Sequence, residues 1–133
     1  MPNGVTYSGD FENCYSLKNI SLPKTISELG NFSGCKSLKI LSIPEGPYYL
    51  SSQKLLDTGL EKISIPDTFT VIDEYGYSGT RIKEIILPSH VESFRDHAFS
   101  GCKLLVKATV PTDVDEYDGN MDGWYAFYEC DNL

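Results

Sequence analysis

Residues 11–29, FENCYSLKNISLPKTISEL, hold the pattern that decides the fold. An aromatic residue is followed three positions later by a cysteine, then by Leu17, Ile20 and Leu22, and then by a proline. The same order of residue types returns along the chain, most plainly from Phe99 onward. Prolines keep the phase at Pro2, Pro23, Pro44, Pro66, Pro88 and Pro111. A period of 21 to 23 residues predicts a repeat protein.

The prolines divide the chain into six repeats, and we expect residues 1–133 to form one domain. The repeats are 2–22, 23–43, 44–65, 66–87, 88–110 and 111–133. In each repeat the last three apolar positions alternate with polar ones, which is typical of a strand with one buried face. A proline ends each strand because it has no N–H to donate. We therefore predict short parallel strands stacked about 4.8 Å apart, one per coil.

The pattern Phe-x-x-Cys-x-x-Leu-x-x-Ile-x-Leu-Pro-x-x-Ile-x-x-Leu resembles the BspA-like type of leucine-rich repeat, and it covers essentially the whole chain. The departures from it are Leu55, Thr58, Tyr77, Thr80 and the irregular Gly46-Pro47. The resemblance implies an α/β-type leucine-rich-repeat solenoid of six right-handed coils. One parallel sheet would line its concave face, and loops or 3-10 turns its convex face. It also implies a secreted or surface-attached adhesion protein that binds host or neighbouring-cell proteins, and no enzyme.

The amino-acid composition limits the classes of partner that the chain is expected to bind. The chain is 41% apolar and 12% aromatic, and its 19 acidic and 11 basic residues give a net charge of -8. These numbers predict a folded domain, and the acidity argues against nucleic acid or an anionic membrane surface as the main partner. No stretch has the roughly 20 apolar residues needed for membrane insertion. No secretion signal is expected in residues 1–133, so we expect a fragment of a longer surface protein.

The charge is unevenly distributed within the repeat. Between the cysteine position and the next proline, the five complete segments hold eight basic and two acidic residues, whereas the rest of the chain holds 3 basic and 17 acidic. Lysines at similar phase predict a basic stripe along the strands, and its candidate ligand-binding members are Lys18, Lys39, Lys62, Lys83 and Lys107. Such a stripe either only keeps the strand edge soluble or steers acidic proteins or anionic glycans to the sheet. The alternative role for the array is a structural spacer that carries an attached enzyme or anchoring domain.

The sixth repeat contains an insertion with the spacing of a calcium loop. Asp118, Asn120, Asp122, Trp124 and Glu129 occupy ligand positions of that pattern, with Gly123 at the turn. The preceding residues do not resemble an entering helix, so an acid-rich surface loop is the favoured interpretation and calcium the alternative. No other cofactor is expected.

The four cysteines share one phase of the repeat with two threonines, Thr58 and Thr80. A small buried residue that bonds the loop backbone explains both residue types. The alternative is a pair of disulfides between neighbouring coils, Cys14 with Cys35 and Cys102 with Cys130.

The two histidines, His90 and His97, are predicted to be surface residues. Asp96, His97 and Ser100 do not form a catalytic triad, because they are too close in sequence to reach its geometry.

The ends of the array carry no polar capping repeat. We therefore predict head-to-tail self-association.

Overall fold

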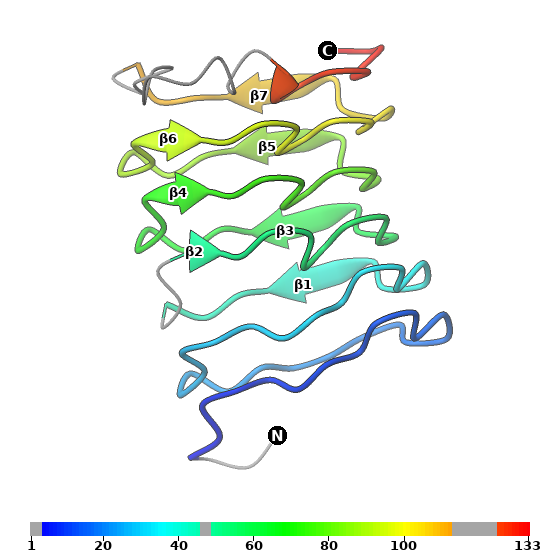
Figure 1. Cartoon of the computed structure of the whole chain (residues 1–133), viewed down its shortest axis with the longest axis vertical. Coiled ribbons are helices and arrows are strands. Elements are labelled where there is room, and N and C mark those ends of the chain that lie inside the picture. The colour runs from blue at the N-terminus through cyan, green and yellow to red at the C-terminus, as the bar shows by residue number, and fades with distance from the viewer. Residues whose placement is uncertain (1–3, 46–48, 113–124) are drawn as a thin grey trace.

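The computed structural model describes residues 4–45, 49–112 and 125–133. The chain winds through successive coils that stack along one axis, and the first and last described coils lie at opposite ends of the stack (Figure 1). Each coil passes a strand-bearing face, turns, and returns along the opposite face. The short strands alternate between these two faces in the order of the chain.

One face, here called the long-strand face, carries four three-residue strands: β1 (Ile40–Ser42), β3 (Lys62–Ser64), β5 (Glu84–Ile86) and β7 (Lys107–Thr109). β1 pairs with β3 and β5 pairs with β7, both in parallel. The sheet was expected to be continuous, but these are two separate sheets. Between β3 and β5, the Arg81 N–H donates to the Leu60 carbonyl at 2.9 Å, so the coils are joined just before the strands begin.

The opposite face, here called the short-strand face, carries a second kind of sheet where loops or 3-10 turns were predicted. β2 (Tyr49–Leu50), β4 (Val71–Ile72) and β6 (Ser93–Phe94) pair in parallel, and a single parallel bridge joins Tyr7 to Glu28 at the same repeat position. The prediction of one sheet was wrong because extended, half-buried backbone needs hydrogen-bond partners on this face too. Stacking supplies them from the next coil, as when the Arg95 N–H donates to the Ile72 carbonyl at 2.9 Å.

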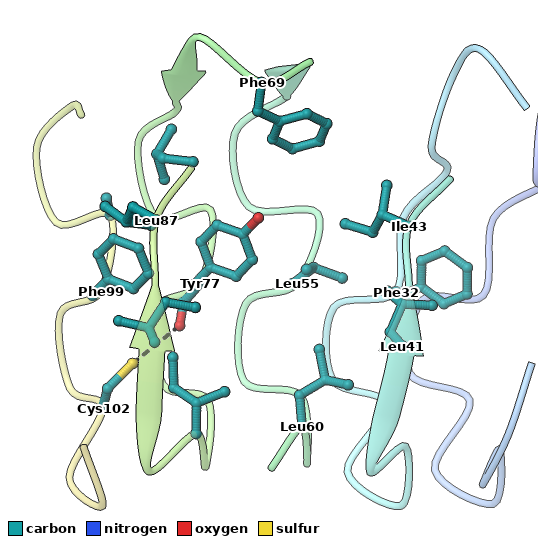
Figure 2. Packing of buried hydrophobic residues seen from close by; sticks show 14 of the residues in the cluster. Phe32, Leu41, Ile43, Leu55, Leu60, Phe69, Tyr77, Leu87, Phe99 and Cys102 are labelled. Atoms are coloured by element: carbon teal, nitrogen blue, oxygen red, sulfur yellow. Dashed lines mark hydrogen bonds between the residues drawn. The ribbon is translucent and has the colours of Figure 1, made fainter. Parts of the chain in front are cut away.

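The interior between the two faces is filled by the repeated apolar positions. Aromatic side chains of successive coils stack on one another: Tyr77 and Phe99 have ring centroids 5.2 Å apart, and Phe99 and Phe127 5.1 Å apart. Figure 2 shows Tyr77 and Phe99 side by side among the buried leucines. Each fully covered Leu, Ile or Phe contributes roughly 1.5–3 kcal/mol. The stack of coils thus buries a core that a single coil could not form.

The turn that holds the aromatic residue and the cysteine has the same backbone form in each coil. The residue just before the cysteine position has a positive φ of 54° to 72° in every coil, and this column is Asn13, Gly34, Asp57, Gly79, Gly101 and Glu129. Glycine and asparagine suit this left-handed conformation best. After this bend the cysteine position faces the core and the residue that follows it is exposed, as at Cys35 and Lys36, and this geometry positions side chains of the candidate site described below.

Candidate binding surface

The outward positions of the long-strand face are exposed, as the period-two alternation predicted. Lys62 lies opposite Ile40 in the register, and Lys107 lies opposite Glu84. Ile40 and Ile86 are 56% and 72% exposed, so two isoleucines stand on an otherwise small and polar surface. Ser42, Ser64 and Thr109 are also exposed. The inward partners, such as Leu41 and Ile85, are buried.

The five predicted lysines are all exposed, but they occupy two adjacent columns rather than one. Lys18, Lys39 and Lys83 each directly follow a core residue of the repeat, and Lys39 and Lys83 stand one position before β1 and β5. Lys62 and Lys107 stand on the first residue of their strands. Acidic residues interrupt both columns, because Glu61 falls between Lys39 and Lys83, and Glu84 falls between Lys62 and Lys107. The structure therefore gives a basic band with two acidic interruptions.

Only one of these lysines is paired with an acid within the described ranges. Lys39 Nζ lies 2.7 Å from Glu61 Oε1 in the next coil. This hydrogen bond and the lysine charge hold the pKa of the Glu61 carboxyl below its ordinary value. Across residues 4–45, 49–112 and 125–133, the four other lysines have no carboxylate within 4 Å. Their charge is open to an external anion.

A groove of about 500 Å³ lies between the first and second coils, beside the turn. It is lined by Lys18, Asn19, Lys36, Ser37 and Lys39. Three of the five lining residues are cationic and none is acidic. Lys36 was not among the predicted site residues, although it belongs to the basic segments. The signal that could have identified it is its place directly after Cys35, where the turn directs a side chain outward.

The cysteines are all free thiols, and three of them bond the loop backbone as predicted, of which Cys35 and Cys102 are buried and Cys130 is half-buried. Cys35 Sγ donates to the Phe11 carbonyl at 3.0 Å, Cys102 Sγ to that of Tyr77 at 3.2 Å, and Cys130 Sγ to that of Phe99 at 3.2 Å. Cys14 is exposed, because none of the described residues forms a coil that covers it on that side.

The threonines bond differently, within their own turn. Thr58 Oγ1 donates to the Leu55 carbonyl at 3.0 Å, and Thr80 Oγ1 to the Tyr77 carbonyl at 2.9 Å.

A hydrogen bond with the Cys130 thiol, together with burial, raises the pKa of Cys102. Cys102 is therefore a structural thiol in its neutral form.

His97 does not lie on the open surface as predicted. Its ring stacks between Tyr75 and Tyr125, with centroid distances of 4.9 Å and 5.5 Å, and it is half-buried. The neighbouring coils place an aromatic residue at the same phase on either side, which the residue's own sequence neighbours do not reveal. His90 is exposed as expected.

The predicted calcium loop falls largely outside the described residues. Asp118, Asn120, Asp122 and Trp124 lie there, and only Glu129 is described. Glu129 is exposed and has a φ of 57° in the turn before Cys130. Calcium binding stays a prediction.

Short parallel strands, stacked coils and a leucine-rich interior define a leucine-rich-repeat protein. The family model described as BspA type leucine rich repeat region matches residues 6–133 in six copies. The chain therefore belongs to the BspA-type leucine-rich-repeat family, as the sequence pattern predicted.

Two solved structures share this fold. A leucine-rich repeat protein from Bacteroides ovatus ATCC 8483 is 27% identical, with a TM-score of 0.75 over 84% of this chain and 30% of that one. A leucine rich cell surface protein from Faecalibacterium prausnitzii A2-165 is 19% identical, with a TM-score of 0.55 over 100% of this chain and 57% of that one. The chain thus spans less than two thirds of either. No curated protein matches it. Within the described ranges, no helix is long and apolar enough to cross a membrane.

Proposed function

We propose that this chain is a binding module of a cell-surface adhesion protein and that its ligand contacts the basic band of the long-strand face. The observation that carries the proposal is the groove beside that face, with three lysines and no acidic residue in its lining. Membership of the BspA-type family supports a binding role. The description of one structural neighbour as a cell surface protein supports the extracellular location.

The ligand is an acidic protein or an anionic glycan of a host or neighbouring cell. Lys18, Lys62, Lys83 and Lys107 have no acidic partner within the described ranges, and Lys39 shares only the one ion pair with Glu61. Lysines that form no ion pair on one face of a folded protein attract a negatively charged ligand and speed its association. The chain as a whole is acidic, so the band also orients the ligand towards one side of the molecule. In this proposal the long-strand face is the concave side of a right-handed solenoid.

The test replaces Lys39, Lys62 and Lys83 with glutamate in one variant. Its matched control replaces the three basic residues outside the basic segments, Lys24, Lys54 and Arg95, so both variants change the net charge equally. Binding to host extracellular material is then measured with each purified protein. We expect the first variant to lose binding and the control to keep it. If both variants bind like the parent chain, the ligand does not contact the basic band, and if the parent chain itself does not bind, the array is a structural spacer. Either result contradicts the proposed function.

A further inference from the structure

A second column of side chains runs along the turn edge, directly after the cysteine position of each coil. It consists of Tyr15, Lys36, Gly59, Arg81, Lys103 and Asp131, here called the post-cysteine column. Its five side chains are exposed, and Tyr15 is 60% exposed. The left-handed residue two positions earlier sets the turn that directs them outward. This column lies beside the long-strand face and is separate from the predicted band.

The column has a gap at Gly59 that the packing of the coils requires. The Gly59 N–H donates to the Cys35 carbonyl at 3.1 Å, so Gly59 lies directly over the turn of the preceding coil. A Cβ at this position would run into the carbonyl oxygen of Lys36. The missing side chain leaves a hollow of about 340 Å³, here called the Gly59 notch. Its lining is Lys36, Asp57, Thr58, Gly59, Gly79 and Arg81.

Two cations flank the Gly59 notch from opposite sides. Lys36 belongs to the coil before Gly59 and Arg81 to the coil after it, so at about 4.8 Å per coil they stand roughly 10 Å apart along the stack. Neither has a carboxylate within 4 Å in the described part of the chain. A carboxylate or sulfate group in the notch would be held by an ammonium on one side and the forked guanidinium donors on the other.

The notch and the basic groove adjoin at Lys36, which lines both, and together they are here called the track. The track begins near Tyr15, passes Lys18 and Lys36, crosses the notch to Arg81, and reaches Lys103 in a later coil. A ligand that uses it must be a chain with several separated negative charges. Its axis would follow the stacking direction of the coils.

The lining favours a polysaccharide over an acidic peptide. An extended peptide gains affinity from backbone hydrogen bonds at a sheet edge and from pockets for its side chains. Here four backbone N–H groups of the column already donate to carbonyl groups of the protein. The Lys36 N–H donates to Gly34 and the Gly59 N–H to Cys35. The Arg81 N–H donates to Leu60 and the Lys103 N–H to Gly101. The Thr58 hydroxyl is also engaged. What remains is a set of separated cations with an exposed tyrosine ring, on which a sugar ring can stack.

We infer that the post-cysteine column binds a linear anionic polysaccharide, with the acidic group of one sugar in the Gly59 notch between Lys36 and Arg81. Tyr15 contacts a sugar face at one end of the track, and Lys103 binds a further charge towards the other, where Asp131 ends the run of cations. This inference rests on the proposed binding function and gives its ligand class. Asp57 on the rim of the notch opposes the anion and limits the affinity.

The experiment titrates the full 133-residue chain by calorimetry with polygalacturonate, which carries carboxylates, and with dextran sulfate, which carries sulfates. Neutral dextran and polyglutamate are the controls. The double variant Lys36→Ala/Arg81→Ala is compared with Lys24→Ala/Arg95→Ala, which removes the same charge from positions outside both the basic band and the post-cysteine column. All four side chains are exposed, so both variants are expected to keep the fold, and circular dichroism checks this.

We expect one or both acidic polysaccharides to bind, and binding to weaken by about tenfold for each notch cation removed. The Lys24→Ala/Arg95→Ala control should lose much less. Tyr15→Ala should weaken polysaccharide binding but leave polyglutamate binding unchanged. Asp57→Asn should strengthen it, and asparagine is already present at the same turn position as Asn13.

Several results overturn the inference. Equal losses in the two double variants would mean that general charge attraction explains binding. Unchanged affinity in Lys36→Ala/Arg81→Ala would remove the notch from the site, and tighter binding of polyglutamate would assign the track to an acidic protein. In that last case the proposed function survives, because its own test with extracellular material does not depend on the ligand class.

Discussion

The inside and the outside of the same turn differ in how far they vary between coils. Inside, the aromatic position holds Phe, Leu or Tyr in every coil, and the next position of the core holds Cys or Thr. Outside, two residues after the left-handed position, the post-cysteine column holds Tyr, Lys, Gly, Arg, Lys and Asp. Inward side chains must fit the coils on both sides, whereas outward ones meet solvent. The comparison teaches that the repeat specifies the fold and leaves the column free to acquire a binding surface.

The largest expected effect on stability comes from truncating a buried aromatic side chain on the inside of the turn. Phe99 is fully buried and stacks on Tyr77 and Phe127, so Phe99→Ala should lower the free energy of unfolding by about 3–5 kcal/mol, since it removes apolar contacts and leaves a cavity. The exposed Lys103→Ala, four residues away, should change it by less than about 0.5 kcal/mol. Urea unfolding of both variants measures the difference. Similar losses in the two would contradict the division into inside and outside.

A smaller effect separates the two ways of filling the cysteine position. Cys102→Ala should cost about 0.5–1.5 kcal/mol, because the Tyr77 carbonyl loses the thiol bond from the next coil. Cys102→Thr should cost less, since a threonine hydroxyl can bond the carbonyl three residues earlier, as Thr58 and Thr80 do. Urea midpoints of the two variants report the order. Threonine proving as costly as alanine would mean that the bond between coils is what the position requires.

The smallest effect concerns the exposed ion pair on the outside. Lys39 lowers the pKa of Glu61, so the pair's contribution to stability is present at neutral pH and is lost as the pH falls through that lowered pKa. In Lys39→Ala the Glu61 pKa should rise towards its ordinary value while the fold is unchanged. An NMR titration of the Glu61 carboxyl measures the shift. An unchanged pKa in the variant would show that the pair does not form in solution.

Much of the fold could be predicted because the pattern repeats. The columns of Phe32, Leu38 and Leu41 and their equivalents are buried or partly buried as expected, and the outward strand positions are exposed. The second sheet could not be predicted, because β2, β4 and β6 have only two residues each and show no alternation to detect. The stacked position of His97 was also missed, since its partners Tyr75 and Tyr125 are more than twenty residues away.

The candidate site was only partly predictable. The basic character of the strand segments was visible in the sequence, but the distribution of the lysines over two columns depends on the strand register. The basic groove and the Gly59 notch depend on which side chains of neighbouring coils meet, and a glycine gives no sequence signal of a cavity. Lys36 and Arg81 therefore stand out only once the coils are stacked.

The central claim is that this chain binds an acidic ligand through its basic side, and the salt dependence of binding tests it most directly. The affinity for host extracellular material would be measured over a series of salt concentrations for the parent chain, the Lys39/Lys62/Lys83 glutamate variant and its matched control. The account predicts that the affinity of the parent and control falls steadily as salt rises, because screening weakens attraction between exposed charges. An affinity that does not change with salt, or that the glutamate variant keeps, would contradict it.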